Sequence, residues 1–485
     1  MEPSESLLLQ CISLPPRGGR NLQSQLQVQM RQAILSGRLA AGVRLPATRS
    51  LAQALGISRN TVLAVYEQLQ TEGYLQAHGA GGTQVSATAQ RTMQPARPQQ
   101  PADARHRLHP RWQTPAASPP PGGQPPIRID LRLGQPELRH FPFGTWNRLH
   151  ARAVRRLGQV PLGYGQDALG HLPLRDMLVQ HVSALRAVAC TAGDVMVTCG
   201  AQQAFDLIAR ILVTPGRTTV AVEDPGYPLA REAFAAHGAR IAGVPVDAQG
   251  LVVARIPRQA RVVCLTPSHQ FPLGVVLSAE RRVALLQWAR EVDGCIVEDD
   301  YDSEFRYGGR SLDALKTLDS QGSVFYVGTF SKTLFPALRI GFVIAPPWAR
   351  DALARAKTLG DWQCAIHTQE TLASFMRDGH LRRHVRKMHR LYEARRDAIL
   401  QAARPILAPY PSCAGLHVTL ELPAGVQDAP VAAALAQRGI AVEALSRYRL
   451  DAAGAGALAL GFGQADARQI GEAMAAIRQA LGNRP

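Results

Sequence analysis

Lys332 is the residue of this chain whose type and setting most directly suggest chemistry. It lies in residues 328–341, which read GTFSKTLFPALRIG and also contain Arg339. Only four of the 54 basic residues are lysines, so arginine serves almost everywhere that a positive charge is needed. Arginine stays protonated in proteins, whereas a desolvated lysine can lose its proton and form a Schiff base with an aldehyde. Lys332 is therefore a candidate for covalent chemistry, and a solvated surface lysine is the alternative.

A second candidate is a possible phosphate-binding turn at residues 198–202, TCGAQ, between an expected strand and an expected helix. The backbone N–H groups of Gly200, Ala201 and Gln202 would point from the helix N-terminus toward an anion.

Other polar residues follow expected strands in the same way. They are Tyr227, Asp299, Tyr301 and Thr329, while Arg339 precedes a strand. Taken singly, each of them is structural more often than functional.

The elements that must position these residues alternate in type from about residue 127. We expect strands at residues 195–198, 219–223, 262–265, 296–298, 324–328 and 340–344, and helices at 202–212, 229–237 and 279–291. Fully apolar strands that alternate with amphipathic helices indicate an α/β domain with a mostly parallel sheet covered on both faces. Ligands of such sheets gather at the carboxyl ends of the strands, where the candidate residues lie.

Together these residues resemble the pyridoxal 5'-phosphate site of fold-type I aminotransferases. The resemblance implies that Lys332 is the Schiff-base lysine, that Asp299 pairs with the pyridine nitrogen and that Tyr301 bonds the ring hydroxyl. A carboxylate beside that nitrogen keeps the ring protonated, so that the ring acts as an electron sink.

The same resemblance assigns the remaining contacts. Tyr227 would stack on the ring, and the phosphate would be held by Gly200, Ala201, Thr329 and Arg339, with Gln202 of the same turn as a further cofactor contact. Tyr164 resembles the residue that reaches the phosphate of the neighbouring subunit, which implies a homodimer.

Two positions depart from the aminotransferase pattern. Phe271 stands where an asparagine usually bonds the ring hydroxyl; His269 beside it is a candidate contact, and Tyr301 can supply that bond. Ala459 stands where an arginine usually clamps the substrate carboxylate. Arg447 or Arg449 is the alternative for this role. Without the clamp, we do not expect efficient turnover of ordinary α-amino acids.

The composition suggests a further, basic unit. A length of 485 residues with 46% apolar residues suggests about three globular domains. The net charge of +17 suggests a polyanionic partner. Residues 6–66 contain seven arginines and no acidic residue, as expected of a domain that binds a phosphate backbone.

The cysteines and the hydropathy pattern indicate a cytoplasmic protein. Seven scattered cysteines without a CxxC pair indicate reduced thiols and argue against zinc and a disulfide framework. We find no signal peptide and no apolar run of membrane-spanning length.

The basic segment has the spacing of a helix-turn-helix. We expect helices at residues 21–36 and 48–55, a turn at Gly56, and a third helix capped by Ser58. Two short strands at residues 73–76 and 83–86 would form a wing.

Residues 37–69 resemble the signature of GntR-type winged-helix DNA-binding domains. The residues that this resemblance assigns to DNA are Arg49, Ser58, Arg59, Asn60, Thr61, His78 and Gly79. Arginine and asparagine at a helix N-terminus can enter the major groove. The alternative is a helical domain whose arginines are only solvated, and the sequence does not separate base contacts from phosphate contacts.

The order of these parts resembles the MocR subfamily of GntR regulators. The predicted domains are a winged helix-turn-helix at residues 1–86, a linker with ten prolines at 87–126, a pyridoxal phosphate-binding large domain at 127–346 and a smaller α+β domain at 347–485. The resemblance implies a transcription regulator that binds operator DNA and senses an amine, an amino acid or pyridoxal phosphate itself. The alternative is an active aminotransferase that carries a DNA-binding domain.

Overall fold

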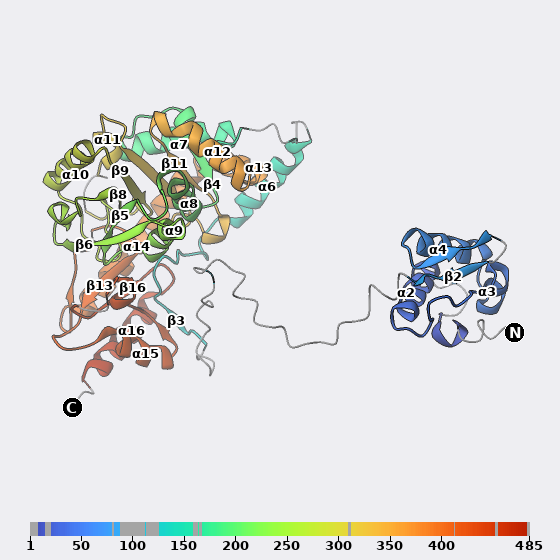
Figure 1. Cartoon of the computed structure of the whole chain (residues 1–485). Coiled ribbons are helices and arrows are strands. Elements are labelled where there is room, and N and C mark those ends of the chain that lie inside the picture. The colour runs from blue at the N-terminus through green and yellow to red at the C-terminus, as the bar shows by residue number, and fades with distance from the viewer. Residues whose placement is uncertain are drawn as a thin grey trace. The chain divides into compact units, whose positions relative to one another are not determined.

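The computed structural model consists of two compact units, Met1–Ala117 and Ser118–Pro485, which we call the smaller and the larger unit (Figure 1). It describes residues 8–14, 21–79, 82–87, 112, 126–158, 163, 167–308, 312–411, 413–451 and 454–482. Most of the predicted linker therefore lies outside the described residues. Within them, no helix has both the length and the apolar composition that crossing a bilayer requires.

The smaller unit contains a helix-turn-helix with a two-stranded wing. Its elements are α2 (Leu22–Leu35), α3 (Thr48–Leu55), α4 (Arg59–Thr71), β1 (Leu75–Ala77) and β2 (Thr83–Val85). Gly56 ends α3 with a φ of 66°, a conformation that glycine adopts at little cost. Ser58 then caps α4 by accepting a hydrogen bond from the N–H of Thr61 at 3.1 Å. The predicted helix-turn-helix with a wing is confirmed.

The larger unit contains an eight-stranded mixed sheet. In spatial order its strands are β4 (Val195–Thr198), β11 (Gly341–Ile344), β10 (Val324–Thr329), β9 (Cys295–Asp300), β8 (Ala260–Leu265), β5 (Thr219–Asp224), β6 (Arg240–Asp247) and β7 (Gly250–Leu251). The pairs from β10 to β6 are parallel, and β11 is antiparallel to both of its neighbours. The predicted strands form this sheet; β6, which contains Gly243 and Pro245, was not predicted.

Helices cover both faces of this sheet. They are α6 (Phe143–Leu157), α7 (Leu172–Arg186), α8 (Ala201–Leu212), α9 (Pro228–Ala236), α10 (Ala279–Val292), α11 (Leu315–Leu318), α12 (Arg350–Gly360) and α13 (Ile366–Arg377). Alternate residues of one strand reach opposite layers: Val195 and Val197 pack with α6, α7 and α13, while Met196 packs with α8, α9 and α12. The sheet is therefore buried on both faces, as its apolar strands predict.

The C-terminal part has its own sheet and core. Its elements are α14 (His380–Ala403), β12 (Ala408–Pro409), β13 (His417–Glu421), α15 (Asp428–Gln437), β14 (Ile440–Ala441), β15 (Glu443–Ala444), β16 (Ala457–Gly461) and α16 (Ala467–Gly482). Its four-stranded sheet has the order β12-β13-β16-β15. Strand β3 (Ile129–Asp130) pairs with β14, and Ile129 joins the core beside α14 and α16. The proposed large domain thus begins with residues that pack in the C-terminal part.

Candidate cofactor and DNA-binding sites

A cavity of about 750 Å³ in the larger unit collects most of the candidate cofactor residues. Its lining includes, from the strand ends and the loops that follow them, Ala201, Gln202, Tyr227, Asp299, Tyr301, Thr329, Lys332 and Arg339. The C-terminal part contributes Leu416, His417, Glu443, Arg447 and Tyr448. The carboxyl edge of the sheet therefore forms one side of the cavity and the C-terminal part forms the other.

Lys332 presents its amine to this cavity. Its Nζ donates a hydrogen bond to the carbonyl of Gly134 at 3.0 Å. Burial lowers the pKa of Lys332, although the nearby carboxylates of Asp302 and Asp299 oppose this effect. The residue thus has the desolvated setting in which a lysine can act as a nucleophile.

Gly134 also lines the cavity, which the sequence did not reveal. A Cβ at residue 134 would come within 2.4 Å of the Nζ of Lys332, and the backbone φ of 73° also favours glycine. No motif marks this glycine, because its partner is 198 residues away in the chain.

The other three lysines have different surroundings. Lys316 donates to the carbonyl of Val324 at 2.7 Å, Lys357 is fully buried and pairs with Asp361, and Lys387 is exposed on α14. Lys332 is the lysine that lines the cavity.

Asp299 carries a buried carboxylate oxygen that the described residues leave without a hydrogen-bond partner. Burial, together with the charges of Asp300, Asp302 and Glu223, raises the pKa of Asp299 well above its ordinary value. Such an oxygen needs a donor or a cation to compensate its desolvation. A protonated pyridine nitrogen supplies both, so the donor set fits pyridoxal phosphate.

Tyr301 and His269 lie together, and only Tyr301 lines the cavity. The Tyr301 hydroxyl lies 2.9 Å from Nδ1 of His269 and donates to the His269 carbonyl at 3.1 Å. Nδ1 of His269 is also 3.1 Å from a carboxylate oxygen of Asp302. The structure therefore places His269 behind Tyr301.

The phosphate-binding candidates meet at the start of α8. Gly200 precedes the helix with a φ of 83°, and a Cβ there would lie 3.0 Å from the guanidinium of Arg339. Arg339 donates to the carbonyl of Cys199 at 2.6 Å. The hydroxyls of Thr329 and Ser331 bond each other at 3.0 Å beside this turn. An arginine and two hydroxyls next to a helix N-terminus form a site for an anion.

Aromatic rings also line the cavity. Tyr227 precedes α9, and burial raises the pKa of its hydroxyl to about 12. Phe271 packs edge-to-face against Tyr227, Tyr301 and Tyr448, with ring centroids 5.1 to 5.8 Å apart. Phe271 thus takes part in the cavity wall through its ring, where an asparagine would offer a hydrogen bond.

The structure distinguishes between the three positions considered for binding a substrate carboxylate. Ala459 is fully buried in β16, opposite Thr419 and Glu443 in register, and it does not line the cavity. Arg447 does line the cavity and pairs with Glu443 at 2.9 Å. Arg449 donates to the carbonyl of Ala455 instead.

Tyr164, the residue expected to reach the phosphate of the neighbouring subunit, lies outside the described residues.

The DNA-binding candidates occupy exposed ends of elements in the smaller unit. Arg49 is exposed in the first turn of α3, and Arg59 and Asn60 are exposed in the first turn of α4. Thr61 is half-buried because it takes part in the Ser58 cap. These side chains start at helix N-termini, the position from which recognition helices contact base edges.

The wing residues are exposed as well. His78 donates its N–H to the carbonyl of Gly82 at 2.9 Å, and Gly79 has a φ of 48°. Arg44, which the sequence analysis did not single out, is exposed beside Gly82 and is a further candidate for phosphate contact. Arg31 is paired with Glu72 at 2.6 Å.

Two known families match the chain. The family described as "Bacterial regulatory proteins, gntR family" matches residues 22–85. The family described as "Aminotransferase class I and II" matches residues 144–477.

Similar proteins include regulators that match almost end to end. The chain is 35% identical to "Probable rhizopine catabolism regulatory protein MocR" of Rhizobium meliloti, over 95% of this chain and 94% of that protein. It is 32% identical to "HTH-type pyridoxine biosynthesis transcriptional regulator PdxR" of Corynebacterium glutamicum, over 97% of this chain and 98% of that protein.

The solved structures that resemble it include enzymes. A kynurenine aminotransferase of Pyrococcus horikoshii, solved in complex with PMP, has a TM-score of 0.68 and 28% identity, over 73% of this chain and 90% of that one. A multiple substrate aminotransferase of Thermococcus profundus has a TM-score of 0.67 and 28% identity, over 73% of this chain and 91% of that one.

Proposed function

Because the chain belongs to the MocR-type transcription regulators of the GntR family, we propose that its larger unit binds pyridoxal phosphate at Lys332 and controls DNA binding by the smaller unit. The effector is an amine, an amino acid or pyridoxal phosphate itself. A homodimer is part of this proposal.

One observation carries the cofactor assignment. Asp299, whose buried oxygen has no hydrogen-bond partner among the described residues, lines the same cavity as Lys332 and as Arg339 at the start of α8. A carboxyl group, a nucleophilic amine and an anion site in one cavity match the ring nitrogen, the aldehyde and the phosphate of one cofactor.

Each residue would have a defined task. When bound, pyridoxal phosphate supplies an aldehyde that combines with amines and a ring that withdraws electrons. Asp299 would keep the ring nitrogen protonated, Tyr227 would contact the ring face, and Arg339 with the α8 N-terminus would hold the phosphate. Lys332 would anchor the group.

The side of the cavity formed by the C-terminal part favours sensing of a ligand over catalytic turnover of a substrate. Ala459 offers no charge, and the charge of Arg447 is exposed and paired with Glu443. An exposed ion pair contributes little binding free energy. A ligand carboxylate would therefore be held more weakly than by a buried arginine clamp.

The second candidate function is an active aminotransferase that also binds DNA. The resemblance to solved aminotransferases at 28% identity favours it. An amino-acid panel separates the two: we expect no sustained conversion to keto acids, and conversion at ordinary enzyme rates would contradict the regulator proposal.

Regulation further requires that the ligand bind one DNA-binding state of the protein better than another. A duplex is first selected from a random pool by the full-length chain. The affinity for this duplex is then measured with and without pyridoxal phosphate and candidate amines, while the visible absorbance of bound cofactor is followed.

Lys332→Ala tests the assignment directly, with the exposed Lys387→Ala as the matched control. We expect Lys332→Ala to keep DNA binding and to lose both the absorbance band and the ligand response. An unchanged response in Lys332→Ala would overturn the proposal.

A further inference from the structure

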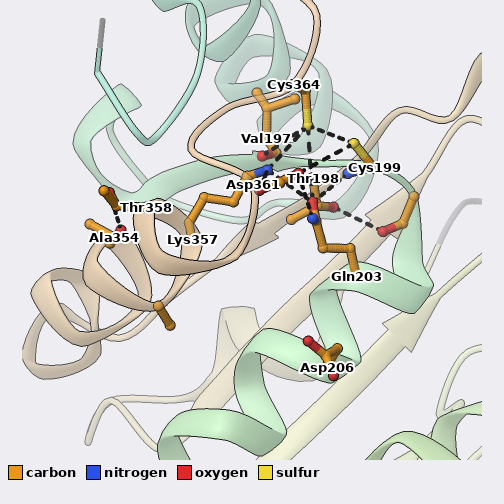
Figure 2. A network of polar contacts seen from close by, with 12 residues as sticks. Val197, Thr198, Cys199, Gln203, Asp206, Ala354, Lys357, Thr358, Asp361 and Cys364 are labelled. Carbon is orange, nitrogen blue, oxygen red and sulfur yellow. Dashed lines mark hydrogen bonds and ion pairs between the residues drawn. The ribbon is translucent and has the colours of Figure 1, made fainter. Parts of the chain in front are cut away.

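Cys199 and Cys364 form a close thiol pair beside the start of α8. Their Sγ atoms lie 3.1 Å apart, although the residues are 165 positions apart in the chain (Figure 2). Cys199 follows β4 and directly precedes Gly200 at the start of α8. Cys364 lies between α12 and α13. Both cysteines are reduced in this structure.

A buried lysine lies against this pair. Nζ of Lys357 is 3.5 Å from Sγ of Cys364 and 2.6 Å from a carboxylate oxygen of Asp361. Gln203 accepts from this amine at 3.0 Å and from the N–H of Cys199 at 2.8 Å. Figure 2 shows Lys357 reaching from α12 toward the two sulfurs.

These contacts make the two thiols unequal. The hydrogen bond between the two thiols lowers the pKa of Cys199 to about 7, and the charges of Lys357 and Arg339 act in the same direction, although burial and the charge of Asp361 oppose them. The pKa of Cys364 is raised, because its proton is shared with Cys199 and because it is buried. Cys199 is also the more exposed of the two thiols, since Cys364 is buried, so we assign Cys199 as the nucleophile of the pair and Cys364 as its resolving partner.

A metal site is the competing interpretation of these side chains. Cys199, Asp361 and Cys364 offer ligand atoms within 4.8 Å of one another. However, the ammonium of Lys357 already contacts both Asp361 and Cys364. A metal cation would have to displace this charge, so the geometry favours thiol chemistry.

The loop that carries Cys364 is held in an unusual conformation. Trp362 has a φ of 65°, in the left-handed region that a bulky residue rarely adopts. The carbonyl of Lys357 accepts the N–H groups of Asp361 and Trp362, each at 3.0 Å. Backbone conformations of this kind cluster at functional sites. Here the conformation brings Cys364 to the end of β4.

We propose that Cys199 and Cys364 are a modification site that a hydroperoxide oxidises to a disulfide, which weakens the neighbouring phosphate site. The Cys199 thiolate attacks the O–O bond, forming a sulfenic acid and releasing an alkoxide that takes up a proton. The Cys364 sulfur then displaces the hydroxyl group; the S–S bond forms, the S–O bond breaks and water leaves with the thiol proton. Two thiols and one hydroperoxide thus give a disulfide, an alcohol and water.

The link to the phosphate site is the backbone of Cys199. Its carbonyl accepts from Arg339 at 2.6 Å, and the next residue opens α8. A disulfide needs its sulfurs about 2 Å apart, so the pair must close by about 1 Å from its present distance. This movement displaces Cys199 relative to the guanidinium. The consequence for the cofactor rests on the function proposed above, whereas disulfide formation does not.

Disulfide formation is tested on the reduced full-length chain with one equivalent of hydrogen peroxide. After alkylation, mass spectrometry of a digest without reductant should show the peptides of Cys199 and Cys364 linked. Cys364→Ser should lose this link and accumulate a sulfenic acid on Cys199 that dimedone traps. Cys295→Ser is the matched control, because burial raises the pKa of this half-buried thiol to about 11. Absence of the 199–364 link, while other thiols are oxidised, would overturn the proposal.

Lys357→Met tests the surroundings of the pair. The variant removes the charge, so alkylation of Cys199 should require a higher pH than in the unmodified chain. The same pH profile in both proteins would show that Lys357 does not activate the thiol.

The consequence is measured as the affinity for pyridoxal phosphate of the reduced and the oxidised chain. We expect about fivefold weaker binding after oxidation, the lower end of coupling between two sites, and full recovery with a dithiol reductant. Equal affinity in both forms would refute the coupling. A chain that binds no pyridoxal phosphate in either form would refute the proposed function and leave the disulfide result standing.

Discussion

At the residue scale, the strongest indication of a ligand in the cavity is the buried oxygen of Asp299, which has no partner in the part of the chain that the structure describes. A buried acceptor without a donor costs about 1–3 kcal/mol, and more when it is charged. The fold retains this acceptor next to the buried amine of Lys332. Such a combination is expected where a ligand completes the hydrogen bonding.

Asp299→Asn should therefore weaken binding of pyridoxal phosphate by about tenfold to a hundredfold, the value of a hydrogen bond to a charged group. Asparagine keeps the shape of the side chain but does not hold a proton on the ring nitrogen. Equilibrium binding measured by absorbance tests this, with the exposed Asp313→Asn as the control. Equal affinity of Asp299→Asn and the unmodified chain would contradict the assignment.

Glu223 should give the larger unit a pH-dependent stability. Burial raises the pKa of Glu223 to about 7, although Thr266 donates two hydrogen bonds to its carboxylate. The folded state then binds more protons than the unfolded state between pH 4.5 and about 7. The stabilisation of the folded state by protonation of Glu223 is fully present below the ordinary pKa of a glutamate side chain. It is lost as the pH rises through about 7. It is on the order of 3 kcal/mol.

Glu223→Gln removes the titrating group and should flatten this fall of stability. The measurement is the unfolding midpoint of the larger unit at several pH values, with the exposed Glu280→Gln as control. A fall of equal size in Glu223→Gln would show that other groups are responsible.

Single residues were predictable from the sequence only where a motif marked them. Lys332, Asp299, Tyr301 and Arg339 were named from their places beside expected strands, and they line one cavity. The contact of Gly134 with Lys332 was not predictable, because residues so far apart meet only through the fold. The same holds for Cys199 and Cys364, which no CxxC spacing marks.

At the scale of elements, the start of α4 concentrates the expected DNA contacts. Arg59→Ala should weaken binding to the selected duplex and reduce the slope of log affinity against log salt by about one. Arg31→Ala is the control, because the charge of Arg31 is already paired with Glu72. A salt slope in Arg59→Ala equal to that of the control would remove Arg59 from the phosphate contacts.

Elements were predictable where periodicity and end signals agreed. Residues 48–55 and 195–198 were predicted with the bounds that α3 and β4 have. Strand β1 begins at Leu75, two residues later than predicted, because Gly73 has a φ of 79° and still belongs to the turn after α4. Strand β6 was not predicted, because glycine and proline disfavour strands unless sheet neighbours support them.

At the scale of the whole molecule, the two compact units should respond separately to ligand. Pyridoxal phosphate at about a hundred times its Kd should stabilise the larger unit by about 2.7 kcal/mol, since it binds the folded state alone. Calorimetry of the full-length chain should show one unfolding transition that rises with the cofactor and one that does not. Lys332→Ala should abolish the rise, and a shift of both transitions together would contradict separate unfolding.

The scarcity of lysine also makes the chain unusually easy to map. A protease that cuts after lysine yields five peptides, divided at residues 316, 332, 357 and 387. Borohydride fixes an aldehyde onto the lysine that holds it, and a substituted lysine is no longer a cleavage site. Attachment at Lys332 would fuse residues 317–332 and 333–357 into one fragment, so a missing cut would report the anchoring residue without any functional assay.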